Sequence, residues 1–318
     1  SSAASDVYKR QLKDQHPDSR GRNLSRAAIE GFPLVMSVVS IVKGQEPVEI
    51  TVKALEMVGA EGACSADGQV LVKPNYINAD HPSTGVTTDG RVIEGVVKFF
   101  REQGFRNIVI GEGAGFADTF HAFRVAGVDK VAERWDARIV DLNKDEFVTV
   151  KPSNPYALQT VRVAKTVLES CIISVPKLKL HKLAGVTLSL KNMMGAVTPK
   201  GSIHGPLSEK IADLASIITP RVAVIDGIIG GEGSETAGEP VEMNLVIAGR
   251  DPVAVDAVGA AVMDVDPRSV KHLVLAEEKG LGTCNLERIE VLGEPIAKVR
   301  RKFRGSFLSK VLHAASLD

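Results

Sequence analysis

Residues 69–115 read QVLVKPNYINADHPSTGVTTDGRVIEGVVKFFREQGFRNIVIGEGAG, and this stretch decides the fold. Short β-branched runs at Gln69–Val72 and Asn107–Ile110 predict two strands. Between them, Asp89–Gln103 is predicted to be a helix, and Gly104 is a suitable stop for it. A strand, a helix and a second strand in this order are typical of parallel strands joined by a crossover helix.

The same alternation continues on both sides of this stretch. Further strands are predicted at Ser37–Val42, Arg138–Asp141, Cys171–Val175, Val222–Ile225, Asn244–Ala248 and Arg288–Leu292. Further helices are predicted at Pro47–Val58, Thr119–Ala126, Val128–Arg134, Leu183–Met194, Leu207–Ile218, Pro252–Met263 and Ser269–Lys279. Phe147–Lys151 and Gln159–Val163 are predicted to form an antiparallel hairpin, at a sheet edge or as a flap. The predicted fold is α/β, a mostly parallel open sheet with helices on both faces and a small β-hairpin insertion.

Composition divides the chain into three parts. Residues 1–35 are interpreted as a disordered lead-in, and its first eleven residues, SSAASDVYKRQ, resemble translated adapter sequence. The natural N-terminus, with any export signal, would then be missing. Residues 36–294 carry the α/β pattern. Residues 295–318 form a tail in which 298–310 hold six basic and no acidic residues, which predicts a basic amphipathic helix. Such a helix packs on the domain, or contacts a membrane surface or a partner.

The overall charge and the cysteines exclude several classes of protein. Lys+Arg and Asp+Glu both total 39, and aromatic residues make up 4%, so a dedicated nucleic-acid binder is not expected. No apolar run approaches the ~20 residues of a membrane span. Cys64, Cys171 and Cys284 lie far apart, which favours unpaired apolar fillers in a reducing, cytoplasmic setting. The chain has no CxxC pair, so no iron–sulfur cluster is expected within it.

A basic cluster follows the predicted strand 171–175. In VPKLKLH, strand alternation past Pro176 places Lys177, Lys179 and His181 on one side. Three adjacent basic groups repel one another unless they surround an anion or one lysine is held neutral as a base. Lys191 and Asn192 follow at the end of the next predicted helix. The alternative is a solvated basic edge.

Two further groups follow predicted strands in the same way. Lys73 and Asn75 come where Pro74 ends a strand, so they belong to the rim loop. Glu112 lies in the glycine loop 111–115, whose GxGxG spacing departs from the GxGxxG of dinucleotide sites. The nearest acidic strand end, Asp141, is also farther on than the about 20 residues that fingerprint expects. A glycine turn that presents Glu112 and backbone N–H groups to a ligand is favoured.

Asp226 directly follows the predicted strand Val222–Ile225. It could hold a metal or move a proton, with Glu232 as a second weak metal ligand and the Gly-rich loop after Asp226 closing over substrate. Asp251 before Pro252 predicts a helix cap. Asp256, inside an apolar helix, needs a lysine, a helix N-terminus or backbone donors as a partner.

Other polar residues are open to two readings. Thr88 and Asp89 are expected to cap the next helix, or its N-terminus binds an anion. His81 and His204 lie in polar loops, where each is a plain surface residue or, as the alternative, a functional one, with His204 as a ligand contact. The strongest clusters all begin where a predicted strand ends, which is where open α/β sheets bind ligands.

These motifs resemble a known family. VLVKPN, the loop after NIVIGEG, VPKLKLH, GVTLSLKNMMG, VIDGIIGGEG and DPVAVDAVGA occur in the order of the family called domain of unknown function 362, over roughly residues 36–294. The resemblance implies an α/β domain that in many relatives travels with a ferredoxin-like iron–sulfur module, which this chain lacks. The family name implies no reaction.

The leading hypothesis is an enzyme that acts on a small anionic metabolite, a carboxylate or a phosphate ester. Lys73, Lys177 and Lys179 would bind the anion, with Lys191, Glu112 and His204 as further ligand contacts. His181, Asp226 or Lys179 would move a proton, and Asn75 and Asn192 would orient polar groups. The alternatives are a redox accessory protein that docks a separate ferredoxin, and a membrane-surface protein that uses the basic tail.

Overall fold

The deciding stretch folds as the sequence predicts. The computed structural model describes residues 36–203 and 205–305. In it, β2 (Gln69–Lys73) and β3 (Ile108–Glu112) are parallel neighbours, with Val70 opposite Ile108. The crossover helix α4 (Gly90–Glu102) is capped by Asp89, whose carboxylate accepts from the backbone N–H of Arg91, so the predicted cap is confirmed.

Within the described ranges, ten strands form one sheet. Along its main path the order is β13-β1-β12-β11-β7-β2-β3-β4, and β8 pairs with β11 and with β9 off this path. Apart from β2 and β3, its strands are β1 (Ser37–Lys43), β4 (Arg138–Asp141), β7 (Ser170–Ser174), β8 (Lys177–His181), β9 (Gly185–Val186), β11 (Val222–Glu232), β12 (Glu239–Gly249) and β13 (Ile289–Gly293). Only β12 runs antiparallel to its neighbours along the main path, which confirms a mostly parallel sheet.

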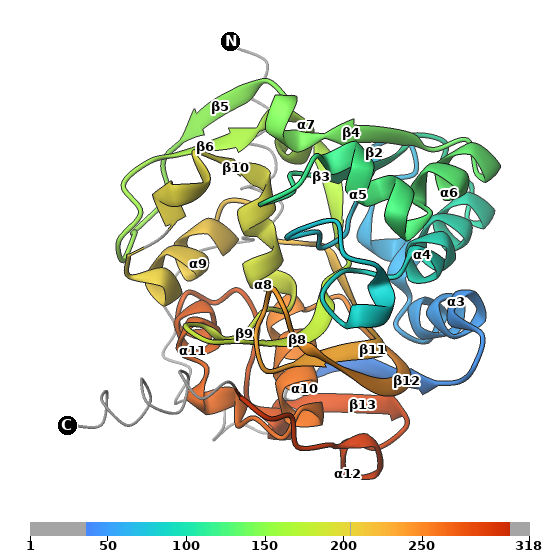
Figure 1. Ribbon diagram of the computed structural model, residues 1–318. Coiled ribbons are helices and arrows are strands. Elements are labelled where there is room, and N and C mark those ends of the chain that lie inside the picture. The colour runs from blue at the N-terminus through green and yellow to red at the C-terminus, as the bar shows by residue number, and fades with distance from the viewer. Residues whose placement is uncertain (1–35, 204, 306–318) are drawn as a thin grey trace. The chain divides into compact units, whose positions relative to one another are not determined.

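Helices cover both faces of the sheet, as predicted. Val246 and Ala248 of β12 belong to the apolar core that includes residues of α3 and α4. On the other face, a Cβ added to Gly259 of α10 would lie 2.6 Å from Cδ1 of Ile225. Figure 1 shows α3, α4 and α6 side by side along one flank. The helices longer than one turn are α3 (Pro47–Met57), α4, α5 (Thr119–Ala126), α6 (Val128–Arg134), α9 (Leu207–Ala215), α10 (Pro252–Val262) and α11 (Lys271–Glu278).

The predicted hairpin is also confirmed. β5 (Phe147–Val150) and β6 (Val161–Ala164) pair antiparallel, with Phe147 opposite Ala164. They do not join the main sheet. The short strand β10 (Val197–Thr198) pairs with β6 and makes a separate three-stranded sheet.

The predicted helix Leu183–Met194 is wrong for most of its length. The chain instead turns back through β9, pairs with β8, and becomes helical only at α8 (Ser189–Asn192). Gly185 has a φ of 78°, which no helix residue adopts. The carboxylate of Asp256 then accepts from the backbone N–H groups of Ser189 (2.7 Å) and Leu190 (2.9 Å), which fixes the start of α8. Backbone donors are therefore the partner that buried Asp256 required.

The Gly-rich segment after Asp226 is not a flexible loop. It continues β11 to Glu232 and pairs with β12, with a register shift between Gly227 and Ile229. Its glycines allow close packing, because a Cβ on Gly231 would lie 2.4 Å from the carbonyl oxygen of Gly85. The expectation that this segment closes over a substrate is therefore wrong.

The chain after residue 295 is only partly described. α12 is a single turn, Ile296–Val299, and residues 300–304 are not helical, so the predicted long basic helix is wrong in this part. Phe303 is buried, and Arg304 binds Glu232. The rest of the tail, 306–318, and the lead-in 1–35 lie outside the described residues. Within 36–203 and 205–305, no helix is long and apolar enough to cross a membrane.

The reading of the cysteines as unpaired fillers is wrong for two of the three. Cys64, after the 3₁₀ turn Ala60–Ala63, forms a disulfide with Cys171 of β7 across 107 residues. Only Cys284 is a buried free thiol. The disulfide removes the argument from cysteine usage for a reducing compartment, and the cytoplasmic location stays a prediction.

We expect loss of this disulfide to destabilise the fold. The C64A/C171A variant should lose about 2–4 kcal/mol of unfolding free energy, because the crosslink restricts a long loop of the unfolded chain. Urea denaturation with and without a thiol reductant measures this. Reductant should lower the midpoint of the natural chain and leave that of the double variant unchanged. An unfolding midpoint of the natural chain that ignores reductant would contradict the disulfide.

Candidate functional site

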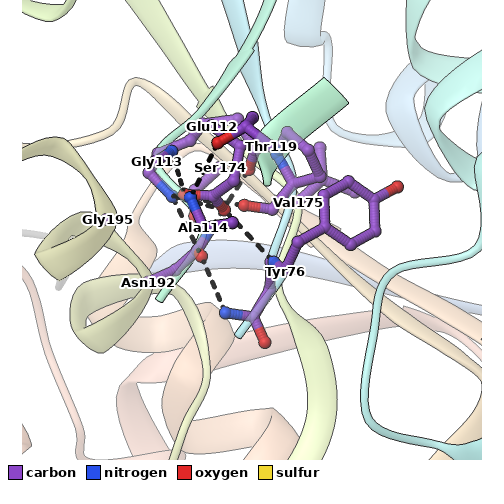
Figure 2. Close-up of polar contacts among 12 residues, drawn as sticks. Tyr76, Glu112, Gly113, Ala114, Thr119, Ser174, Val175, Asn192 and Gly195 are labelled. Carbon is purple, nitrogen blue, oxygen red and sulfur yellow. Dashed lines mark hydrogen bonds and ion pairs between the residues drawn. The ribbon is translucent and has the colours of Figure 1, made fainter. Parts of the chain in front are cut away.

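A buried ion pair joins the ends of β2 and β3. The Lys73 ammonium lies 2.9 Å from both carboxylate oxygens of Glu112, and both side chains are almost fully buried. Glu112 also accepts from the backbone N–H groups of Gly113 and Tyr76. Figure 2 shows Glu112, Gly113, Tyr76 and Asn192 gathered around these contacts. Burial lowers the pKa of Lys73, although Glu112 opposes this.

Two asparagines extend this pair toward the solvent side. Asn192 of α8 donates to the carbonyl of Lys73 (3.0 Å) and to Ser174 Oγ (3.1 Å), and its Oδ1 accepts from Lys73 Nζ (3.3 Å) and Asn75 Nδ2 (3.3 Å). Asn192 is thus saturated. Asn75 Oδ1 is buried and has no hydrogen-bond partner among the described residues. A buried amide oxygen of this kind is a candidate acceptor for a ligand donor.

A second buried ion pair lies in β8 and β11. Lys177 Nζ is 2.7 Å from Asp226 Oδ2, and both side chains have no exposed surface. Asp226 also accepts from the backbone N–H groups of Asp89 (2.7 Å) and Ile228 (3.0 Å). Neither Lys177 nor Asp226 lines the cavity described next, and the buried Lys73 does not line it either. The structure therefore separates these three predicted site residues from those that reach the cavity.

A cavity of about 560 Å³ opens beside the first ion pair. Its position between β3, β8 and α8 is the strand-end rim that the sequence predicts as a ligand site. Four lysines line it. Three of them, Lys179, Lys191 and Lys200, are called here the lysine cluster, and the fourth, Lys182, pairs with Glu235 at 3.6 Å. The other lining residues used below are Asn75, Phe116, His181, Leu183, Thr187 and Glu235.

The lysine cluster has no ion pair with any residue in the described ranges. Lys179 donates to the carbonyls of Val86 (2.8 Å) and Glu235 (3.0 Å), and Lys200 to that of Gly195 (2.7 Å). The ammonium of Lys191 has no such acceptor there. Burial and the charges of Lys191 and Lys177 lower the pKa of Lys179 to about 7. Burial lowers the pKa of Lys191 and that of Lys200 to about 8.

His181 is held as a neutral ring. Its Nδ1 accepts from the backbone N–H groups of Leu183 (3.2 Å) and Ala184 (3.1 Å), so the proton is on Nε2. Nε2 lies 3.7 Å from Glu235 Oε1. Burial and the neighbouring lysine charges lower the pKa of His181 to about 2. The separation from Glu235 is too long for a hydrogen bond, so this carboxylate does not offset the effect of burial.

The remaining acidic candidates serve the fold. Glu232 accepts from the backbone N–H (2.7 Å) and Nε (2.8 Å) of Arg304. Both of its carboxylate oxygens are therefore occupied and are not free to bind a metal together with Asp226. Asp251 caps α10 as predicted. In the described ranges no group of three His, Cys, Asp or Glu side chains could hold a metal ion. A divalent metal stays a prediction without a site in these residues.

Among the remaining candidates, His81 is on the surface as an N-cap, and His204 lies outside the described residues. Sequence reasoning missed Lys200, Glu235 and Thr187. Lys200 precedes His204 in the loop TPKGSIH, so the polar loop itself was the available signal. Nothing in the sequence marked Glu235, which reaches the cavity only because β11 and β12 are long.

The fold and the cavity define an α/β protein with a lysine-rich cavity at the ends of its sheet strands. The chain belongs to the family described as a domain of unknown function (DUF362), whose model matches residues 70–261. It is also similar to a thylakoid-associated protein of Synechocystis sp., with 26% identity over 253 residues, which are 76% of this chain and 77% of that protein. No solved structure matches the chain significantly.

Proposed function

We propose that this chain is an enzyme that binds a small anionic metabolite, a carboxylate or a phosphate, in the cavity. The observation that carries the proposal is the lysine cluster around one cavity: Lys179 is buried, Lys191 and Lys200 are half-buried, and none of the three forms an ion pair with a carboxylate of the described residues. Burial removes part of the hydration of each protonated amine, and the charge of Lys191 also repels that of Lys179, so the ligand-free site destabilises the fold. An anion would relieve both effects.

Lys179 is the group we assign to proton transfer. A neutral lysine has two N–H donors and one lone pair, and two carbonyls already accept from Lys179. Its pKa of about 7 lets it exchange a proton near neutral pH. His181 is a neutral Nε2–H donor in this proposal, because its lowered pKa keeps it unprotonated. Asp226 is left out, since it is saturated and outside the cavity.

Proton uptake on binding tests the proposal. At about pH 8, near the pKa of Lys191, an anion should raise the lysine pKa values and draw protons from the buffer. Calorimetric titration with inorganic sulfate, which does not titrate there, in two buffers of different ionisation enthalpy counts these protons. We expect uptake of about one proton. The exposed-lysine variant Lys53→Gln should behave like the natural chain. Binding heats that do not depend on the buffer, or absence of binding, would contradict the proposal.

The other expectations from the family resemblance stay predictions. A redox accessory protein that docks a separate ferredoxin would be favoured by co-purification of an iron–sulfur protein. The relative's association with thylakoids fits the membrane-surface alternative, for which the basic residues after 298 would have to bind liposomes. The proposal rests instead on the cavity.

A further inference from the structure

The entrance of the cavity is apolar. Phe116 is 79% exposed and Leu183 is 59% exposed, which makes them the two most exposed large apolar side chains of the described chain. Both line the cavity that holds the lysine cluster. Single exposed apolar residues are ordinary on protein surfaces, but two of this size at one cavity are a feature to explain.

The backbone of both residues is hydrogen-bonded to neighbouring segments. The backbone N–H of Phe116 donates to the carbonyl of Ile77 at 2.7 Å, and that of Leu183 donates to His181 Nδ1 at 3.2 Å. The acceptor of the Leu183 hydrogen bond, His181, is itself a residue of the site. These hydrogen bonds hold the backbone of Phe116 and Leu183 beside the cavity, where a ligand could cover the exposed side chains.

The exposed fractions of the lining residues distinguish the inner end of the cavity from its mouth. Lys179 is 2% exposed and forms part of the inner end, whereas Phe116 and Leu183 form part of the mouth. The cavity of about 560 Å³ lies within the range of sites for organic ligands, roughly 300–1,000 Å³. A bare oxyanion at the lysines would leave most of this volume, and the whole mouth, unfilled.

We infer that the ligand is an amphipathic organic anion, with its carboxylate or phosphate at the lysine cluster and an apolar group against Phe116 and Leu183. This inference rests on the proposed function and adds the class of substrate. Two residues that line the same cavity, Asn75 and Thr187, carry a buried oxygen without a hydrogen-bond partner among the described residues, which a polar group of such a molecule could approach after a small side-chain rotation. A docked protein could also cover the mouth, but it would leave the enclosed lysines unmatched.

Matched pairs of anions test this inference on the full chain. Methyl phosphate and phenyl phosphate share a head group, and acetate and phenylacetate repeat the comparison for carboxylates. We expect the aromatic member of the pair that binds to be about tenfold tighter or more by calorimetry, since burial of the ring adds affinity. Phe116→Ser and Leu183→Ser should remove most of this preference and keep the affinity for the small anion. Leu286→Ser, an exposed leucine away from the cavity, should change neither affinity.

The outcomes separate the two proposals. Equal affinities within each pair, with the small anions bound, would overturn the inference and leave the proposed function standing. If none of the four anions binds, the proposed function fails, and the inference fails with it. A preference for the aromatic anions that survives in both serine variants would also overturn the inference, because the ring would then bind elsewhere.

Discussion

Replacing Asp226 by asparagine is expected to lower the unfolding free energy by about 3–5 kcal/mol, because it leaves the Lys177 ammonium buried and unpaired. Both side chains of this ion pair have no exposed surface, so water cannot take the place of the carboxylate. Asparagine also turns an amide N–H₂ toward donors, since Asp226 accepts from two backbone N–H groups as well as from Lys177. Urea denaturation at neutral pH measures the loss.

A surface ion pair is the matched control for this variant. Glu294 pairs with Lys298 at 2.8 Å, but the lysine is 70% exposed, so Glu294→Gln should change stability by no more than about 0.5 kcal/mol. The same experiment decides between two roles for Asp226. If Asp226→Asn folds as stably as the natural chain and loses anion binding, the side chain acts in the site as the sequence suggested, and its structural role is wrong.

The fold was readable from sequence where local pattern and tertiary environment agree. The β-branched runs of β2 and β3 and the capped helix between them needed no distant partner to be recognised. The segment 183–194 failed for the opposite reason. Its helix starts at Ser189 only because Asp256, more than sixty residues later, binds the backbone there. No local signal could have placed that start.

Part of the site could also be predicted from the sequence. Residues at strand ends, such as Lys73 and Glu112, meet because parallel strands share one rim. The sequence could not tell which basic residues are paired. Lys177 and Lys179 are two positions apart on β8, yet one is neutralised by Asp226 and the other faces the cavity without a carboxylate. The partner of Lys177 is Asp226 of β11. The glycines after Asp226 predicted a loop, so the sequence did not show that β11 continues beside β8.

Replacing Lys191 by methionine is expected to separate stability from binding. Burial lowers the pKa of this lysine from 10.5 to about 8, so between these values the unfolded chain binds more protons than the folded one. Stability of the ligand-free natural chain should therefore rise with pH across this window and be lost as the pH falls. A shift of this size corresponds to no more than about 3 kcal/mol. Methionine has a similar length and no charge, so Lys191→Met should gain about 1–3 kcal/mol at neutral pH and lose part of the pH slope.

The same substitution should weaken binding of inorganic sulfate by about tenfold or more, because an ammonium that faces the anion is lost. Denaturation from about pH 7 to pH 10 and calorimetry with sulfate give the two results on one protein. Lys53→Met, on an exposed face of α3, controls for the change in total charge and should alter neither. A lysine that lowers stability and raises affinity is the pattern of a site maintained for function. Unchanged sulfate affinity in Lys191→Met would mean that this amine does not bind the anion, and it would contradict the assignment of the lysine cluster to anion binding.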